Sequence, residues 1–253
     1  MRETPPTEGN APPIQVKGLH KSFGEQIVLN GINLEVAQGK TLTVLGRSGT
    51  GKSVLLKVIV GLQLPDSGSV CIHGQEIAGL PRERLNEIRR KIGFLFQNAA
   101  LYDSLTVQQN VAFPLERQAK ASAGEIRNRV RELLSAVGME KGLDRLPGEI
   151  SGGMQKRVGL ARALALSPDI LLFDEPTAGL DPITAGEIDD LILKMQRERG
   201  ITSIVVTHDL PSARAISNRL ALMRDGEIVV EGTFEELKEN KDDFVVQFMN
   251  RGC

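Results

Sequence analysis

Residues 46–53 read Gly-Arg-Ser-Gly-Thr-Gly-Lys-Ser, and this glycine-rich loop carries the residue types that hold a phosphate group. Its spacing matches GxxxxGK followed by Ser or Thr. Glycines let successive backbone N–H groups turn inward on an anion. The lysine can reach the β- and γ-phosphates of a nucleotide, and the final serine can bind Mg²⁺. The candidate ATP-binding residues are therefore Gly46, Arg47, Ser48, Gly49, Thr50, Gly51, Lys52 and Ser53.

The segments on either side of the glycine-rich loop support this interpretation. Residues 41–45 predict a buried strand, and residues 53–60 predict a helix whose N-terminus faces the anion. Strand, loop and helix in this order are the context that the motif requires. A glycine-rich surface turn is the alternative, and the context disfavours it.

Polar side chains also follow two later apolar segments. Residues 170–173 predict a buried strand that ends at Asp174 and Glu175, and residues 203–206 predict another that leads to His208. Ligands of parallel sheets bind outside the carboxyl ends of the strands. We therefore expect these side chains to meet the glycine-rich loop. Asp174 alone could equally be a helix cap, Glu175 a surface residue and His208 a structural one.

Three further features complete the pattern. A strand at residues 93–96 leads into Gln97, and the signature segment, residues 151–155 (SGGMQ), lies between a turn and a helical run. Residues 178–181 (AGLD) form a turn before Pro182. An SGG triplet by itself usually marks a flexible turn, so these features gain meaning only together.

In this order, these elements resemble the ATPase subunit of the ATP-binding cassette (ABC) transporters. The resemblance covers residues 14–248 and implies one α/β domain with a P-loop NTPase core on a mixed, mostly parallel sheet. It also implies an N-terminal antiparallel β subdomain and a helical subdomain inserted at about 98–150, where residues 125–137 show one apolar helical face. We expect residues 1–13 to be a disordered tail and residues 249–253 a second tail.

The resemblance also implies roles for the polar residues. Glu175 is the general base for the attacking water, His208 contacts the γ-phosphate, and Gln97 touches the Mg²⁺ and water site and links it to the membrane partner. Ser53, Asp174 and Gln97 are then the Mg²⁺ ligands, with ATP and Mg²⁺ as cofactors. The residues with expected catalytic roles, Glu175, His208 and Gln97, follow three different predicted strands.

Phe23 lies 29 residues before Lys52, where ABC ATPases commonly place an aromatic ring against adenine. A π-face is sufficient for stacking, so a phenylalanine fits. The alternative is a buried phenylalanine near a hairpin.

The signature segment explains why two copies are expected. A helix N-terminus with bare glycines is an anion site, yet one nucleotide does not need two phosphate cradles from one chain. In the family, the second cradle closes on the nucleotide of the opposite subunit. The residues expected to contact ATP in trans are Ser151, Gly152, Gly153 and Asp181; for the last, a helix cap is the alternative.

A multipass permease is the expected membrane partner, and this places the chain peripherally at the cytoplasmic face of the inner or plasma membrane. We expect residues 99–111 to dock the permease through Leu101, Tyr102, Leu105 and Val107, because exposed apolar side chains usually mark an interface. The alternative is that these side chains pack inside the insertion.

Local segments narrow the range of possible cargoes. Residues 96–105, 151–154 and 181–184, with the ending at 246–252, look like the Mla-type ATPases, which serve phospholipid or sterol transport with a permease and an MCE-domain protein. A polar amino acid or other small-solute importer is the competing interpretation. The usual glutamine of the signature segment is Met154 here, outside the anion-binding glycines.

Composition and charge argue against several other classes of protein. A net charge of −1 argues against nucleic acid as a partner, and no apolar run approaches a membrane span. Two cysteines predict no disulfide framework and fit a reducing compartment, and the polar first residues predict no signal peptide.

A soluble ABC ATPase of DNA repair or translation would carry long coiled coils or two cassettes. A regulatory module without turnover would not need Lys52, Asp174, Glu175 and His208 intact.

Overall fold

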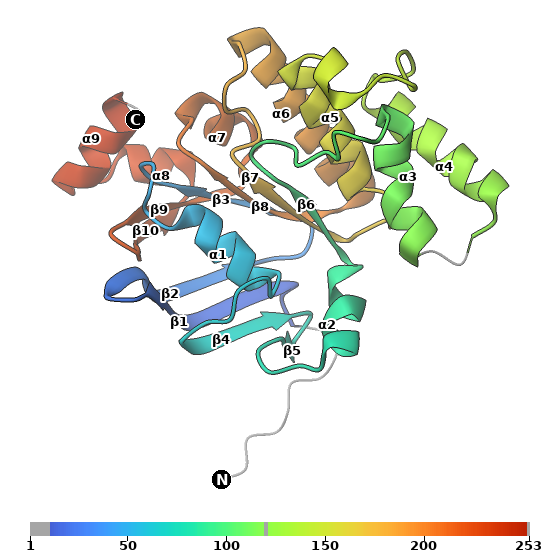
Figure 1. Ribbon diagram of the computed structural model, residues 1–253. Helices are drawn as coiled ribbons and strands as arrows, with labels where there is room; N and C mark the ends of the chain where they lie inside the picture. Colours follow the sequence, from blue (N-terminus) through green and yellow to red (C-terminus); the bar gives the residue numbers. More distant parts are fainter. Residues whose placement is uncertain (1–10, 119–120, 252–253) are drawn as a thin grey trace.

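The computed structural model describes residues 11–118 and 121–251, and its backbone forms two sheets with helices between and around them (Figure 1). The smaller sheet has the order β2-β1-β4-β5 and is antiparallel. Its strands are β1 (Ile14–Phe23), β2 (Gln26–Val36), β4 (Ser67–Ile72) and β5 (Gln75–Glu76). This is the N-terminal antiparallel β subdomain that the resemblance implied.

The larger sheet has the order β10-β9-β3-β8-β7-β6, and every neighbouring pair is parallel except β9 with β10. The apolar runs of β3, β7 and β8 are buried along their whole length, because both faces of the sheet are covered. The bounds are β3 (Thr41–Leu45), β6 (Ile92–Leu95), β7 (Ile170–Asp174), β8 (Thr202–Thr207), β9 (Arg219–Arg224) and β10 (Glu227–Gly232). The expected mixed, mostly parallel sheet is confirmed.

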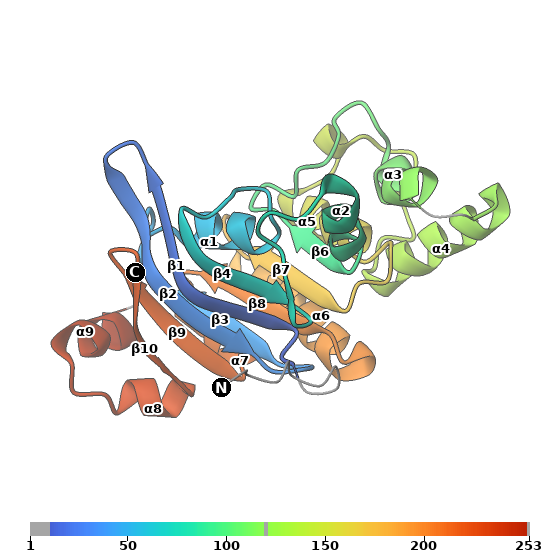
Figure 2. The same ribbon diagram turned by 90° about the horizontal axis from the view of Figure 1, so that it is seen from below.

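Helices cover the two faces of this sheet in different ways. Helix α1 (Lys52–Ile59) lies between the two sheets, where Leu55 and Leu56 are fully buried (Figures 1 and 2). The opposite face carries α5 (Gly152–Ala163), α6 (Pro182–Arg199) and α7 (Leu210–Ile216). Helix α2 (Arg82–Arg89) precedes β6. The larger sheet is therefore covered on both faces, and the glycine-rich loop lies at the carboxyl end of its inner strand β3.

The helical insertion contains α3 (Val107–Gln118), α4 (Ala123–Ala136) and the short 3₁₀ turn η1 (Pro147–Glu149). Helix α4 begins with a capping box between Ser122 and Glu125 and matches the predicted apolar face. Leu133 and Leu134 are buried in a core that continues onto the central sheet. Helix α3 was not predicted, because Pro114 lies inside it.

The chain ends differ from the expected tails. Residues 1–10, 252 and 253 lie outside the described residues. Pro13, however, is buried, and its carbonyl accepts from the N–H of His73, so the tail expectation is wrong there. After α8 (Phe234–Lys238), helix α9 (Asp243–Arg251) runs past the expected boundary at Phe248, and Met249 packs against the C-terminal core.

A buried carboxylate lies where α6 packs on α7. Asp189 is buried, and Oδ1 accepts from the hydroxyl of the buried Ser212 at 2.6 Å. Burial raises the pKa of Asp189 to about 6; the Ser212 bond opposes this rise, and the charges of Asp209 and Asp190 add to it. Ionising this carboxyl in the folded chain at neutral pH therefore costs stability.

We predict that the contribution of Asp189 to stability falls as the pH rises from about 4 to about 6, because the folded carboxyl holds its proton to higher pH than the unfolded one. Replacing Asp189 by Asn removes that cost and should raise the free energy of unfolding at pH 7.5 by about 1–2 kcal/mol. Urea unfolding between pH 4 and 8 measures both effects. An exposed carboxylate farther along the same helix provides the control, Glu198→Gln; equal pH slopes for the two variants would contradict the assignment.

Candidate nucleotide site

The glycine-rich loop needs its glycines for two physical reasons. Gly49 has φ of 84° and Gly51 has φ of 100°, which side-chain-bearing residues rarely adopt. A Cβ on Gly51 would also lie 2.7 Å from the carbonyl oxygen of Val28. The loop is therefore fixed in place by β2, and it leads directly into the N-terminus of α1, the end of a helix that attracts anions.

Lys52 is the buried cation of the loop. Its ammonium donates to the carbonyl oxygens of Gly46 at 2.7 Å and Arg47 at 3.0 Å, and it lies 3.5 Å from Glu175 Oε1. Residues predicted from segments more than a hundred positions apart are thus brought into one cluster. A buried ammonium held by carbonyls can turn to a polyphosphate, which offers stronger acceptors.

Ser53 and Asp174 form the expected magnesium side of the site. The Ser53 hydroxyl donates to Asp174 Oδ1 at 2.7 Å, across the interface of α1 and β7. Burial raises the pKa of Asp174, which the bond from Ser53 opposes. A hydroxyl and a buried carboxylate fit Mg²⁺, which takes few protein oxygens and keeps waters and phosphate oxygens. Among the described residues, no three His, Cys, Asp or Glu side chains gather as a metal site.

Glu175 is held from both sides in an unusual backbone conformation. Its φ is 48°, its N–H donates to Val206 O at 2.9 Å, and its side chain is buried. Oε2 accepts from the hydroxyl of Thr207 at 3.1 Å and from Nδ1 of His208 at 2.9 Å. A non-glycine residue in this region stores strain that the surroundings must stabilise, as is common at functional sites. The strands β7 and β8 therefore aim one carboxylate at the cluster.

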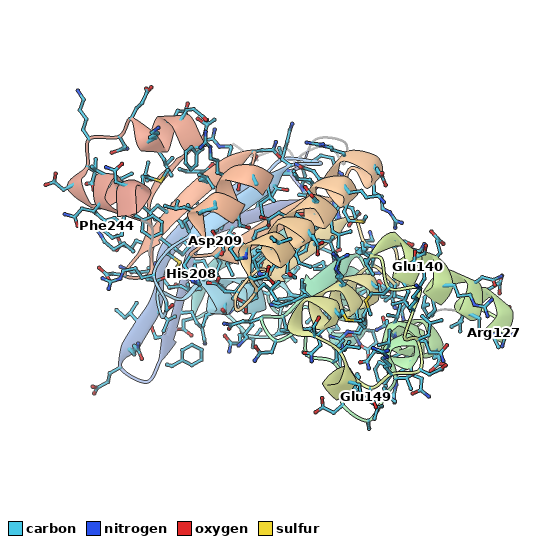
Figure 3. All side chains as sticks on the ribbon, turned by 90° about the horizontal axis from the view of Figure 1, so that it is seen from above. Arg127, Glu140, Glu149, His208, Asp209 and Phe244 are labelled. Carbon is cyan, nitrogen blue, oxygen red and sulfur yellow. The ribbon has the colours of Figure 1, made fainter. Side chains whose placement is uncertain are left out.

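His208 remains open to solvent, and its side chain is 41% exposed. Figure 3 shows it beside Asp209, between the C-terminal helix that carries Phe244 and the helical insertion. With Nδ1 bonded to Glu175, the Nε2 atom remains for a ligand. A hollow of about 330 Å³ adjoins this ring and is lined by Glu175, Thr177, Gly179 and Leu180, among others.

Gln97 enters the site through its backbone. The carbonyl oxygen of Gln97 accepts from the ammonium of Lys156, which also donates to the carbonyl of Glu175 at 3.0 Å. Burial lowers the pKa of Lys156 to about 8, although the charges of Asp174 and Glu175 raise it. Lys156 was not predicted from the sequence, because a lysine directly after the signature segment is ordinarily a surface residue. The side chain of Gln97 itself is exposed.

A second hollow, of about 440 Å³, opens between the glycine-rich loop and the β1–β2 hairpin, and Gln26, Ile27 and Val28 line it. Phe23 ends β1 and is 46% exposed, with the ammonium of Lys21 lying 5.3 Å from the ring centre. The alternative of a buried phenylalanine is wrong. Its ring is available for stacking, and its contact with adenine stays a prediction.

The signature segment begins a helix, as expected. Ser151 is the N-cap of α5, where its hydroxyl accepts from Met154 N, and both Ser151 and Gly152 are exposed. Gly153 is buried, and a Cβ on it would lie 2.4 Å from Thr184 Cγ2. This glycine therefore lets α5 approach α6 closely.

Asp181 is the N-cap of α6. Its Oδ1 accepts from the N–H groups of Ile183 and Thr184, each at 3.1 Å, and the Thr184 hydroxyl lowers the pKa of the carboxyl. Within the chain, Asp181 is thus a helix cap, which was the alternative interpretation. A contact of Asp181 with a second copy stays a prediction.

Comparison with known proteins places these features in a family. The sequence profile of the ABC transporter family matches residues 29–178. The chain is 39% identical to the intermembrane phospholipid transport system ATP-binding protein MlaF of Haemophilus influenzae, over 93% of this chain and 89% of that protein. It is 41% identical to the probable ribonucleotide transport ATP-binding protein mkl of Mycobacterium leprae, over 94% of this chain and 68% of that one.

One further protein and one solved structure are also similar to this chain. The methionine import ATP-binding protein MetN of Brucella abortus is 39% identical over 98% of this chain, which spans 66% of that protein's length. The dimeric ATP-binding cassette MJ0796, solved in a post-hydrolysis state with ADP and Pi, superposes with a TM-score of 0.81 at 37% identity, covering 87% of this chain and 98% of that chain. The chain belongs to the ABC transporter family, as an ATP-binding subunit whose ATP hydrolysis is coupled to transport.

Proposed function

We propose that this chain binds Mg–ATP on the glycine-rich loop and that Glu175 is the base for its hydrolysis. The observation that carries the proposal is one cluster in which Glu175 lies within reach of Lys52, Thr207 and His208, next to the Ser53–Asp174 pair. A base must lie within hydrogen-bond reach of the water that it deprotonates, and the three partners fix the direction of this carboxylate.

Each residue has a step in this mechanism. Glu175 takes a proton from water as the water oxygen bonds to the γ-phosphorus and the bond to the ADP oxygen breaks. Lys52 and His208 Nε2 stabilise the negative charge on the phosphate oxygens. Ser53, Asp174 and the Gln97 side chain would hold Mg²⁺, which would supply positive charge to neutralise the phosphates. Phe23 holds the adenine ring.

The proposal includes a second copy of the chain. Ser151 and Gly152 are exposed at the N-terminus of α5, and Asp181 is exposed at the start of α6. A helix N-terminus favours anions, so this end is suited to the γ-phosphate of a nucleotide on the opposite copy. The dimeric state of the MJ0796 cassette supports this arrangement. In the proposal, ATP joins two subunits and hydrolysis releases them.

A permease completes the assembly in this proposal, and its site is a groove beside the insertion. The groove has a volume of about 450 Å³ and is lined by Arg89, Phe96, Tyr102 and Phe113, among others. Tyr102 is 46% exposed and its ring packs on Phe113. The expectation that Val107 is exposed is wrong, because Val107 is fully buried, and Leu101 packs against the helical core. Docking through Tyr102 and the groove stays a proposal.

We propose a phospholipid or related lipid as the cargo, moved with the permease and an MCE-type protein. The identity to MlaF and the Mla-like segments support it. A polar amino acid or other small solute is the second candidate, because MetN is equally similar. No helix of the described part of the chain is long and apolar enough to cross a membrane. In the proposal, the permease holds the chain at the cytoplasmic face of the inner or plasma membrane.

Replacing Lys52 by Ala should abolish ATP hydrolysis, because the variant loses the buried ammonium that contacts the polyphosphate. We expect a rate at least about 100-fold below the wild type in a phosphate-release assay. Lys57→Ala on the same helix is the control, and near-normal turnover by the Lys52 variant would refute the assignment of the loop.

Replacing Glu175 by Gln should leave ATP binding intact and nearly stop hydrolysis. The amide keeps the volume and the acceptor for Thr207, but it cannot take a proton. Size-exclusion chromatography with Mg–ATP should then show a long-lived dimer. A variant that neither slows nor dimerises on ATP would show that another group is the base.

Replacing Tyr102 by Ser should weaken co-purification with the permease while nucleotide binding stays normal. The ring is exposed, whereas the backbone of Tyr102 is held separately by the buried Asn110. Leu146→Ser, at an exposed apolar residue outside the groove, is the matched control. Unchanged assembly by the Tyr102 variant would contradict the docking site.

The cargo is tested with the assembled transporter in vesicles that contain a fluorescent phospholipid. ATP-dependent movement of the lipid, with no stimulation of ATP hydrolysis by methionine, is the expected result. Stimulation by the amino acid alone would favour the second candidate.

A further inference from the structure

Lys156 is a buried cation that joins three parts of the site. It lies on α5, directly after the signature segment, and the residue is only 5% exposed. Its ammonium donates to the carbonyl of Glu175 at 3.0 Å and to the carbonyl of Gln97. The helix that begins at the signature segment is therefore bonded directly to the residue after β7 and to Gln97, two residues past the end of β6.

The bond to Glu175 acts on a peptide group with little freedom. The left-handed conformation of Glu175 turns its carbonyl toward α5, while its N–H stays on Val206 of β8. Because the backbone is fixed at both polar atoms, the Cα–Cβ direction is fixed too. A shift of Lys156 would therefore redirect the carboxylate that faces Lys52 and His208.

A second cation of α5 holds the segment after Gln97. The guanidinium of Arg162 donates to Ala99 O at 2.6 Å and to Ala100 O at 2.7 Å, and both alanines have positive φ. Residues 97–100 are thus attached to α5 at two places, about two turns apart along the helix. This segment follows α5 as a unit.

Stability alone gives a weak reason for a buried lysine at this position. Burying an ammonium is costly, and a well-packed apolar side chain of similar volume is often as stable or more stable. The ammonium instead provides fixed geometry, because its N–H donors hold two carbonyl groups in place relative to one helix. The arrangement therefore favours a role in the geometry of the site.

We propose that Lys156 is a positioning residue that couples the signature end of α5 to the orientation of Glu175 and Gln97. The proposal rests on the proposed roles of those two residues in hydrolysis. When a nucleotide on the opposite copy draws the signature segment toward it, Lys156 carries that displacement to the carboxylate and to the segment beside the permease groove. In the proposal, Lys156 acts through Glu175 and Gln97 and not on ATP itself.

The test compares three variants of the full chain: Lys156→Met, Lys156→Arg and the control Arg157→Met. Arg157 is the next residue on α5, and it binds Val137 O at 2.8 Å and Glu187 at 2.7 Å without touching Gln97 or Glu175. We expect Lys156→Met to lower kcat for ATP by about 10- to 100-fold while KM and the Kd of a fluorescent ATP analogue stay within about threefold. Lys156→Arg, which keeps several donors, should recover most of kcat.

The decisive measurement is the double variant Lys156→Met with Glu175→Gln. If Lys156 acts through Glu175, the double variant should be about as slow as Glu175→Gln alone, because effects on one unit are not additive. Multiplicative losses, or a kcat for Lys156→Met equal to that of Arg157→Met at the same Tm, would overturn the proposal. A Glu175→Gln variant with normal hydrolysis would instead refute the proposed role of Glu175, independently of Lys156.

Discussion

The structure depends on the burial of four charged side chains at the carboxyl ends of the central strands. Lys52, Lys156, Asp174 and Glu175 are each at most 7% exposed, and a buried charge is tolerated only with partners. Here the partners are backbone carbonyls, two hydroxyls and the opposite charges themselves. Because the cations and carboxylates come from α1, α5 and β7, the core on both faces of the sheet must be complete before the charges are balanced.

This requirement explains how the layers serve the site. Helix α1 is locked between the two sheets, so the glycine-rich loop at its N-terminus has little freedom. On the other face, α5 packs against β6 and against the helical insertion, so the signature segment is carried by a helix with its own buried core. The site therefore has one rigid half on the nucleotide side and one half supported by the insertion.

Much of this was predictable from the sequence, because the strand ends carry their polar residues immediately after apolar runs. The glycine-rich loop, Asp174, Glu175 and His208 follow from that pattern, and the sheet brings the last two within 2.9 Å. Lys156 was missed because its neighbours are distant in sequence and its helix shows no apolar stripe that would mark it as buried. Helix α3 was missed because local propensity at Pro114 opposes a helix, while packing of Val107 and Val111 in the core overrides it. Val107 was assigned to the surface because it was grouped with the apolar side chains of residues 99–111, which were expected to dock the permease.

The close contact of Gly153 with Thr184 has a consequence for motion. With no side chain between them, α5 and α6 meet backbone to side chain near their N-terminal ends, where the signature segment and Asp181 also lie. The two ends then share one degree of freedom, since neither can slide without displacing the other. A second copy that contacts either end would meet the combined stiffness of both helices. The interface would then close in one step and not in two independent steps.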